Sequence, residues 1–507
     1  MKKRSENNPA VSYNFLKAFI TYMFVIHACA PGFSQNKQPD LKVIWDNVTF
    51  VSKTTPTLQV VENPMVRPSS PIHEKTFKAL KDLGADFVRY VPWFPYPKMA
   101  VAELKQPTST ETFWDFTYLD STMAAIMEAT KGHSVVINFS TTPAWMWKTD
   151  KPVIYPEDPY QPFWDYNPGT ALKDSTGKQL ADYYTRLFSW YTKGGFTDEL
   201  GRLHKSGHFY KIPYWEVLNE PDLEHNISPQ LYTKIYDVIV KALKKLSPET
   251  KFIGLSLARV SDPEYFEYFL NPKNHRFGIV PEGISYHHYS SPSWSDQEIS
   301  AYQYTFFEKA DAFLDKVRYI ENIRKRLAPK TFTTINEIGV ILRSPSVIKP
   351  IEEDYWNVAS TLYAYIFLEL TRLGIDVAGE SQLVGYPTQF PDVSMMNWET
   401  GNPNARYWAL RLLHDNFGPG DRLVQTHFEN ATPGGVSAQG FITKKGKKIL
   451  LINRRDVPAE FELPKEMAGG TVSAVDVTTD DNPPSMAKLN GATIKMEPYA
   501  VVVVGKD

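Results

Sequence analysis

The feature that most constrains the fold of this chain is a repeated order of elements, in which an apolar strand-like segment precedes a helix-like segment. Eight such units follow one another between residues 55 and 418. The strand-like segments are nearly continuous apolar runs, which is typical of strands buried on both faces of a parallel sheet. Their predicted ranges are 55–61, 85–91, 134–140, 213–218, 251–257, 283–289, 331–339 and 375–381.

This order of elements predicts an α/β fold, a (β/α)8 TIM barrel, because eight strand-then-helix units close into a ring with the helices outside. A doubly wound open sheet is the alternative. That fold would require a glycine-rich phosphate-binding loop after an early strand, and the sequence contains none there. The barrel is therefore the favoured architecture, and we expect it to occupy residues 45–422.

The sequence changes in character at about residue 423. From there on, short strand-like segments are separated by Gly, Pro, Asn and Asp, and no helical period is present. This pattern predicts a C-terminal antiparallel β-sandwich over residues 423–507.

The N-terminus resembles an export signal. Positive charge at Lys2–Arg4 precedes a mostly apolar stretch over 15–30, and the small residues Gly32 and Ser34 follow. The apolar stretch is too short and too interrupted to span a membrane comfortably. We therefore expect a signal peptide over residues 1–34 and an exported protein, periplasmic or extracellular, although a retained anchor helix is an alternative.

Cys29 is the single cysteine of the chain and lies inside the expected signal peptide. Lipid anchoring through Cys29 is a weaker alternative to cleavage before Gln35. After cleavage the mature chain would contain no cysteine, which excludes disulfides and thiolate metal sites.

The net charge of −2 gives neither the basic footprint of a nucleic-acid-binding protein nor a polybasic membrane patch. Aromatic residues make up 14% of the chain, which indicates a large aromatic core or, alternatively, rings that form flat platforms for sugars or other planar-faced ligands. The sequence does not indicate an oligomeric state.

Two of the predicted strands carry the same pair of residues near their ends. Asn219-Glu220 follows the fourth strand, and Asn336-Glu337 belongs to the seventh. Reactive groups of a TIM barrel lie at the C-terminal ends of its strands, so we expect both glutamates to face one cleft. A carboxylic acid and a carboxylate facing each other are what glycosidic bond cleavage requires. The alternative for either glutamate alone is an ordinary ion-paired or surface carboxylate.

Six segments of the chain carry a resemblance to a known family: "WEVLNEPD", "NFSTTPAWMW", "WDFTYLDSTM", "ISYHHYS", "INEIG" and "PNARYWALRLL". On these segments the chain resembles retaining glycoside hydrolases of clan A, and most closely family 39, the β-xylosidase and α-L-iduronidase family. The resemblance extends over roughly residues 50–507 and is most specific at the fourth strand.

The resemblance implies a role for each matching residue. Glu220 would be the general acid/base and Glu337 the nucleophile. Asn219 would hydrogen-bond the 2-hydroxyl of the sugar. Tyr289 would hold the nucleophile through its hydroxyl group, and His287 would touch the substrate or the acid/base; a structural histidine is the alternative.

Three further residues complete the expected site. Arg89 lies on the second strand, where an unpaired charge is costly to bury. The resemblance makes Arg89 a partner that keeps the nucleophile anionic, and a structural salt bridge is the alternative. Trp145, after the third strand, and Trp398, after the eighth, are candidate sugar platforms or ordinary packing residues.

Two departures from the family pattern weaken the inference of substrate more than that of mechanism. Leu218 stands where the family commonly has tryptophan or a similar residue, and the nucleophile segment reads "INEIG" rather than a "TEW"-like form. We expect β-xylosidase-like, exo-acting hydrolysis of an oligo- or polysaccharide. The alternatives are a glucosidase, glucuronidase, arabinofuranosidase or endo-glucanase of the clan, and a non-catalytic glycan-binding barrel.

No cofactor or metal is expected. The only adjacent histidine pair, His287-His288, would place its side chains on opposite faces of a strand, where they cannot share a metal ion.

Overall fold

The computed structural model of the chain describes residues 39–164, 169–294, 297–342 and 351–506. The expected signal peptide over 1–34 and Cys29 lie outside the described residues. Within them, no helix is long and apolar enough to cross a membrane.

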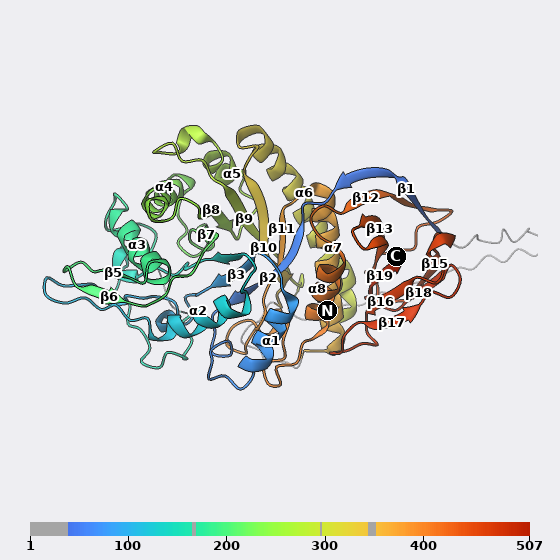
Figure 1. Ribbon diagram of the computed structural model, residues 1–507, viewed down its shortest axis with the longest axis horizontal. Helices are drawn as coiled ribbons and strands as arrows, with labels where there is room; N and C mark the ends of the chain where they lie inside the picture. Colours follow the sequence, from blue (N-terminus) through green and yellow to red (C-terminus); the bar gives the residue numbers. More distant parts are fainter. Residues whose placement is uncertain (1–38, 165–168, 295–296, 343–350, 507) are drawn as a thin grey trace, which may run out of the picture. The chain divides into compact units, whose positions relative to one another are not determined.

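Eight parallel strands form a closed barrel, as predicted, and their order around the barrel is their order along the chain (Figure 1). The ring closes where the last strand pairs in parallel with the first, with Val377 opposite Thr55. The strands are β2 (Thr55–Val61), β3 (Val88–Val91), β4 (Val135–Ile137), β7 (Tyr214–Glu216), β8 (Lys251–Leu257), β9 (Gly283–Ser290), β10 (Phe332–Val340) and β11 (Val377–Glu380). Strands β7 and β10 are thus the fourth and seventh of the barrel, which are the positions expected for the two Asn-Glu pairs.

Helices follow the barrel strands, and the local sequence shows why they form. In α4, Ser228 precedes the helix and its hydroxyl oxygen accepts a hydrogen bond from Leu231 N at 3.2 Å, while Lys244 and Lys245 occupy the last turn. Both features suit the polarity of a helix. The helices are α1 (His73–Leu83), α2 (Thr117–Ala129), α3 (Lys178–Thr192), α4 (Pro229–Leu246), α5 (Pro263–Phe269), α6 (Tyr302–Leu327), α7 (Glu353–Leu373) and α8 (Ala405–Asn416). A small hairpin of β5 (Gly195–Thr197) and β6 (Leu203–Lys205) follows α3.

A second, mainly antiparallel sheet of nine strands carries its own hydrophobic core. Its strand order is β17-β16-β19-β14-β13-β12-β1-β15-β18. The strands are β1 (Asp40–Val51), β12 (Arg422–Glu429), β13 (Val436–Thr443), β14 (Gly446–Asn453), β15 (Ala459–Glu462), β16 (Thr471–Val475), β17 (Ser485–Lys488), β18 (Thr493–Met496) and β19 (Val501–Lys506). The prediction for residues 423–507 was a C-terminal antiparallel β-sandwich, and strands β12 to β19 form most of this sheet.

The contribution of β1 to this sheet was not predicted. We expected residues 45–51 to belong to the barrel domain, but β1 pairs antiparallel with β12, with Leu41 opposite Phe428. Leu41, Val43 and Trp45 alternate with more exposed residues and are buried in the core of the second sheet. The second sheet therefore combines the first described strand with the last eight.

The last barrel helices hold this sheet against the barrel. On α7, Thr361 donates a hydrogen bond to the carbonyl oxygen of Tyr499 at 2.8 Å, and Arg372 donates to that of Ala438 at 2.9 Å. On α8, the Trp408 indole donates to the carbonyl oxygen of Asp481 at 2.9 Å.

Candidate active site

The backbone after β7 turns sharply where the first Asn-Glu pair stands. Leu218 and Glu220 have φ values of 63° and 40°, in the left-handed region that side chains with a Cβ seldom adopt. The Glu220 amide donates to the carbonyl oxygen of Ser256 at 2.9 Å, which fixes the turn to the end of β8. Backbone strain of this kind costs about 1–3 kcal/mol per residue and gathers at functional sites.

The second Asn-Glu pair lies at an irregularity of β10. The pairing of β10 with both neighbours shifts register here, between Thr334 and Glu337 on one side and between Ile335 and Ile338 on the other. Such bulges redirect side chains next to active sites. After the shift, Glu337 lies opposite His287 of β9.

Arg89 of β3 is completely buried and donates hydrogen bonds to one residue of each Asn-Glu pair. Its Nη1 donates to Glu337 Oε1 at 2.6 Å and its Nη2 donates to Asn219 Oδ1 at 2.7 Å. Further bonds reach Gln59 Oε1 at 2.6 Å and Ser256 Oγ at 3.0 Å. The predicted contact between Arg89 and Glu337 is therefore present.

Arg89 has a second anionic partner, Glu216, which sequence reasoning missed. Arg89 Nε donates to Glu216 Oε2 at 2.5 Å, and Glu216 also accepts from Asn138 Nδ2 at 2.5 Å and Asn336 Nδ2 at 2.8 Å. The hydroxyl of Ser285 donates to Glu216 as well. The available signal was a charged residue within the apolar segment "YWEVL", since a buried carboxylate requires such partners.

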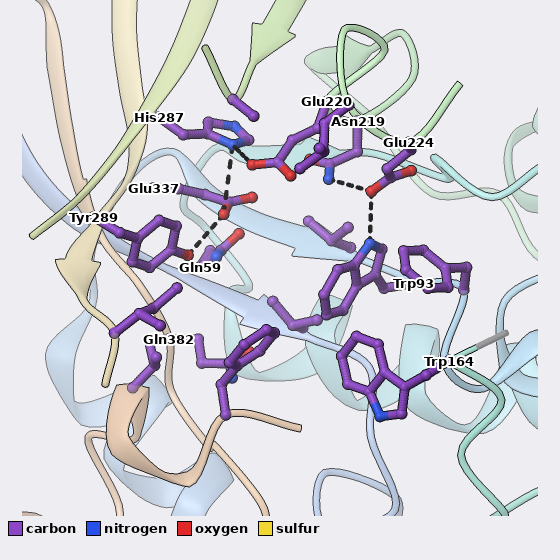
Figure 2. Close-up of a pocket in the computed structure, with 18 residues that line it drawn as sticks. Gln59, Trp93, Trp164, Asn219, Glu220, Glu224, His287, Tyr289, Glu337 and Gln382 are labelled. Carbon is purple, nitrogen blue, oxygen red and sulfur yellow. Dashed lines mark hydrogen bonds and ion pairs between the residues drawn. The ribbon is translucent and has the colours of Figure 1, made fainter. Parts of the chain in front are cut away.

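His287 and Tyr289, the two polar residues expected after the sixth strand, both reach the carboxylates. His287 Nδ1 lies 2.8 Å from Glu220 Oε1 and 3.5 Å from Glu337 Oε2, while its Nε2 lies 3.1 Å from Ser256 Oγ. The Tyr289 hydroxyl donates to Glu337 Oε2 at 2.7 Å. Figure 2 shows the histidine above Glu337 and beside Glu220.

The two carboxyl groups are close to each other. One oxygen of Glu220 and one of Glu337 lie within 4.8 Å, and a ring nitrogen of His287 lies within the same distance of both. Both side chains are largely enclosed, with 14% of Glu220 and 9% of Glu337 exposed.

Their surroundings shift the two acidities in opposite directions. Burial raises the pKa of Glu220 and the negative charge of Glu337 adds to this, although the hydrogen bond and charge of His287 oppose it. Burial also acts to raise the pKa of Glu337. There, however, the charges of His287 and Arg89 and the hydrogen bond from Tyr289 outweigh burial, so the pKa of Glu337 is lowered. The site thus favours a protonated acid at Glu220 and a carboxylate at Glu337.

A cavity of about 570 Å³ opens onto both carboxyl groups (Figure 2). This volume is typical of small-molecule sites. Its polar wall is formed by Gln59, Asn219, Glu220, Glu224, His287, Tyr289, Glu337 and Gln382, and its aromatic wall by Trp93, Phe94, Trp164 and Phe390.

Of the two alternatives given for Trp145 and Trp398, sugar platform or ordinary packing residue, the structure favours packing. Neither Trp145 nor Trp398 belongs to the described residues that line the cavity. The indole of Trp145 donates to the carbonyl oxygen of Glu103 at 2.9 Å, and Trp145 lines two other hollows. Trp398 packs against the barrel core. The tryptophans that line the cavity are instead Trp93, after β3, and Trp164, in the long segment after β4.

Asp222, the last residue of "NEPD", supports the neighbouring loop. Its carboxylate accepts hydrogen bonds from Ala258 N at 3.1 Å and Arg259 N at 2.7 Å, just after β8. Asp222 is therefore a loop-capping residue that fixes the segment after Glu220.

Glu220, His287 and Glu337 are also the described residues that could hold a metal ion together. Each already has a protein partner, however. Both oxygens of Glu337 accept hydrogen bonds, from Arg89 and from Tyr289, and the His287 ring nitrogen that faces Glu220 lies within hydrogen-bond distance of it. The arrangement suits proton transfer between an acid and a substrate, with a carboxylate opposite.

No protein-family model matches the chain, and no curated protein does either. Solved structures do match. The GH51 arabinofuranosidase from Xanthomonas axonopodis pv. citri superposes with a TM-score of 0.63 at 11% identity, over 92% of this chain and 99% of its own.

Two other matches extend this likeness. The thermostable GH51 α-L-arabinofuranosidase from Thermotoga petrophila RKU-1 has a TM-score of 0.60 at 15% identity, over 93% of this chain and 100% of its own. A GH30 endoxylanase from Clostridium papyrosolvens C71 has a TM-score of 0.54 at 13% identity, over 92% and 100%. At these identities the likeness establishes the fold: a (β/α)8 barrel with an accompanying β-sandwich, shared with glycoside hydrolases. The three structures named here carry the names of families 51 and 30, so membership of family 39 stays a prediction.

Proposed function

We propose that this protein is a glycoside hydrolase that cleaves O-glycosidic bonds with retention of anomeric configuration. The observation that carries the proposal is the carboxyl pair at the cavity, Glu220 and Glu337, with one oxygen of each within 4.8 Å of the other and pKa values shifted in opposite directions. Retaining enzymes hold their carboxyl groups about 5–5.5 Å apart, whereas inverting enzymes separate them by about 6.5–9.5 Å to admit a water molecule.

In the first step, the Glu337 carboxylate attacks the anomeric carbon and forms a covalent ester with the sugar. Glu220 gives its proton to the leaving oxygen as the glycosidic bond breaks, so the departing group leaves as a neutral alcohol. In the second step, Glu220 takes a proton from water, and the resulting hydroxide attacks the same carbon. The sugar is released and Glu337 regains its negative charge.

The surrounding residues prepare each carboxyl group for its step. Arg89 and Tyr289 donate to Glu337 at 2.6 and 2.7 Å, which holds the nucleophile ionised and oriented. His287 contacts Glu220 at 2.8 Å and directs the acid. Asn219, whose Oδ1 is held by Arg89, would offer its amide group to the 2-hydroxyl of the sugar.

For the substrate, we propose an exo-acting, β-xylosidase-like enzyme, on the basis of the sequence resemblance to family 39. A second candidate is an arabinofuranosidase, because two of the fold matches described above are named as such. A glucosidase, a glucuronidase and an endo-glucanase are further specificities within the same mechanism.

The test is turnover of a panel of 4-nitrophenyl glycosides, which includes β-xyloside, α-L-arabinofuranoside, β-glucoside and β-glucuronide. We expect hydrolysis of a pentoside, with the first-formed sugar of retained configuration by proton NMR. An inverted first product would contradict the mechanism. Binding of glycans with no turnover of any glycoside would instead indicate a non-catalytic glycan-binding barrel.

Trapping with a 2-fluoro glycoside of the accepted sugar identifies the nucleophile directly. The fluorine slows both steps, so the covalent intermediate accumulates and survives digestion. We expect the labelled peptide to contain Glu337. A label on another carboxylate would assign the nucleophile elsewhere.

A further inference from the structure

A third carboxyl group, that of Glu224, lines the same cavity and has no part in the mechanism above. The turn after Glu220 places it there, because the Glu224 amide donates to the carbonyl oxygen of Glu220 at 2.7 Å. The two side chains are thus one turn apart and reach the same cavity. Figure 2 shows Glu224 beside Asn219 and next to Trp93.

One oxygen of Glu224 is fixed by the protein and the other is not. Oε1 accepts hydrogen bonds from Trp93 Nε1 at 2.7 Å and from Asn219 Nδ2 at 2.8 Å. Within the described part of the chain, no donor or cationic side chain pairs with Oε2. Both partners of Oε1 also line the cavity, so the plane of the carboxyl group is set from the site itself.

Because Glu224 lines the cavity, a ligand bound there can complete the hydrogen bonding of this oxygen. Burial raises the pKa of Glu224 to about 8, and the charge of Glu220 contributes to the shift. At neutral pH the group is therefore mostly a neutral acid, which can both donate and accept a hydrogen bond. A sugar hydroxyl has the same two capacities.

We propose that Glu224 is a specificity-determining residue, whose Oε2 binds one ring hydroxyl of the substrate sugar. Trp93, held by the same carboxyl group, then presents its indole ring to the sugar beside that contact. The substrate class follows: sugars with a free hydroxyl at that one position are accepted, and sugars that lack the hydroxyl are rejected. This inference rests on the proposed glycosidase function and concerns the same cavity.

A purely structural role is the competing explanation, in which Glu224 only holds Trp93 and Asn219 in place. The two roles differ in how they combine with a change in the substrate. Loss of a direct contact has no further effect when the sugar hydroxyl is already absent, whereas loss of an anchor affects every substrate alike.

The experiment measures kcat/KM for the accepted aryl glycoside and for its monodeoxy analogues, one for each ring hydroxyl. Four proteins are compared: the wild type, Glu224→Ala, Glu224→Gln and the control Glu128→Ala. Glu128 lies on α2 with 66% of its side chain exposed. Glu224→Asp, which keeps a carboxyl group but is one methylene shorter, replaces the alanine variant if that variant does not fold.

We expect one deoxy analogue to react at least about 100-fold more slowly with the wild type, because the hydrogen-bonding partner of Glu224 is missing. Glu224→Ala should lose a similar factor on the parent glycoside and show no additional loss with that analogue. Glu224→Gln keeps an acceptor for Trp93 and Asn219 and a donor for the sugar, so it should stay within about tenfold of the wild type. Glu128→Ala should behave as the wild type.

Equal losses of Glu224→Ala on the parent and on every deoxy analogue would overturn this inference, while turnover by the wild type would leave the glycosidase proposal standing. Failure of the wild type to hydrolyse any glycoside would overturn the proposed function and this inference together. The two failures are therefore distinguished by the wild-type measurement alone.

Discussion

Arg89 and Glu216 form an ion pair of 2.5 Å between Nε and Oε2 in which both side chains are completely buried. Glu216 is held in turn by the amide groups of Asn138 and Asn336. The guanidinium plane is therefore fixed from one side, and its remaining donors point to Glu337 and Asn219. A buried pair of this kind positions the proposed nucleophile through residues that take no part in the chemistry.

Removal of the Glu216 carboxylate should destabilise the folded protein. In Glu216→Ala, the Arg89 charge loses a buried partner, and breaking such a pair typically costs about 3–5 kcal/mol. We expect the free energy of unfolding in urea to fall by about that amount. The matched control is Asp182→Ala, which removes the exposed partner of Lys178 and should cost no more than about 0.5 kcal/mol. Equal free energies of unfolding of the two variants would show that the buried pair does not stabilise the fold.

The fold could be predicted from the sequence because the barrel strands are apolar on both faces and regularly followed by helices. Strand β1 escaped prediction for the opposite reason. It alternates buried and exposed residues only over Leu41–Trp45, and its partner β12 lies far along the chain. Pairings of this kind leave no local signal in a sequence.

The candidate site was predictable only in part. Glu220, Glu337, Arg89, His287 and Tyr289 are brought together as expected, since strand-end residues of a barrel share one face. The aromatic wall was not predictable, because Trp93 and Trp164 come from loops whose paths depend on packing rather than on strand order. Glu216 and Glu224 were overlooked because each stands next to a more conspicuous residue of the same segment.

The nucleophile assignment predicts a specific chemical rescue. Glu337→Ala should lower kcat by at least about 1000-fold, because no group remains to attack the anomeric carbon. Sodium azide should restore turnover, since the small anion fits the space of the missing carboxylate. Its product should be a glycosyl azide of inverted configuration, identified by NMR. Unchanged activity of Glu337→Ala without azide would place the nucleophile elsewhere.

The acid/base assignment predicts a dependence on the leaving group. Glu220→Ala should retain kcat/KM within about tenfold for dinitrophenyl glycosides, whose leaving groups need no proton, and lose about 10²–10⁴-fold for alkyl glycosides. With azide, this variant should form a glycosyl azide of retained configuration, because the anion intercepts the covalent intermediate. The contrast with Glu337→Ala makes each variant the control of the other. A uniform loss across leaving groups would indicate that Glu220 does not donate the proton.

The contacts of His287 predict a shift of the whole pH profile. Activity requires Glu337 ionised and Glu220 protonated, so kcat/KM should fall at acid pH as Glu337 gains a proton and at alkaline pH as Glu220 loses one. Despite burial, the charge of Glu337 and the contact with Glu220 raise the pKa of His287. Its positive charge in turn lowers the pKa of Glu337 and acts against the rise at Glu220.

In His287→Gln, which keeps polar atoms at this position but cannot carry a charge, the pKa values of both carboxyl groups should rise. The acid limb then moves upward because Glu337 is protonated at a higher pH, and the alkaline limb moves upward because Glu220 holds its proton longer. We expect both limbs of the kcat/KM profile to move to higher pH by about 1 unit or more. The control is His133→Gln, whose side chain is 38% exposed and should leave the profile unchanged. A profile that stays in place or moves to lower pH in His287→Gln would show that His287 does not set the charges of the carboxyl pair.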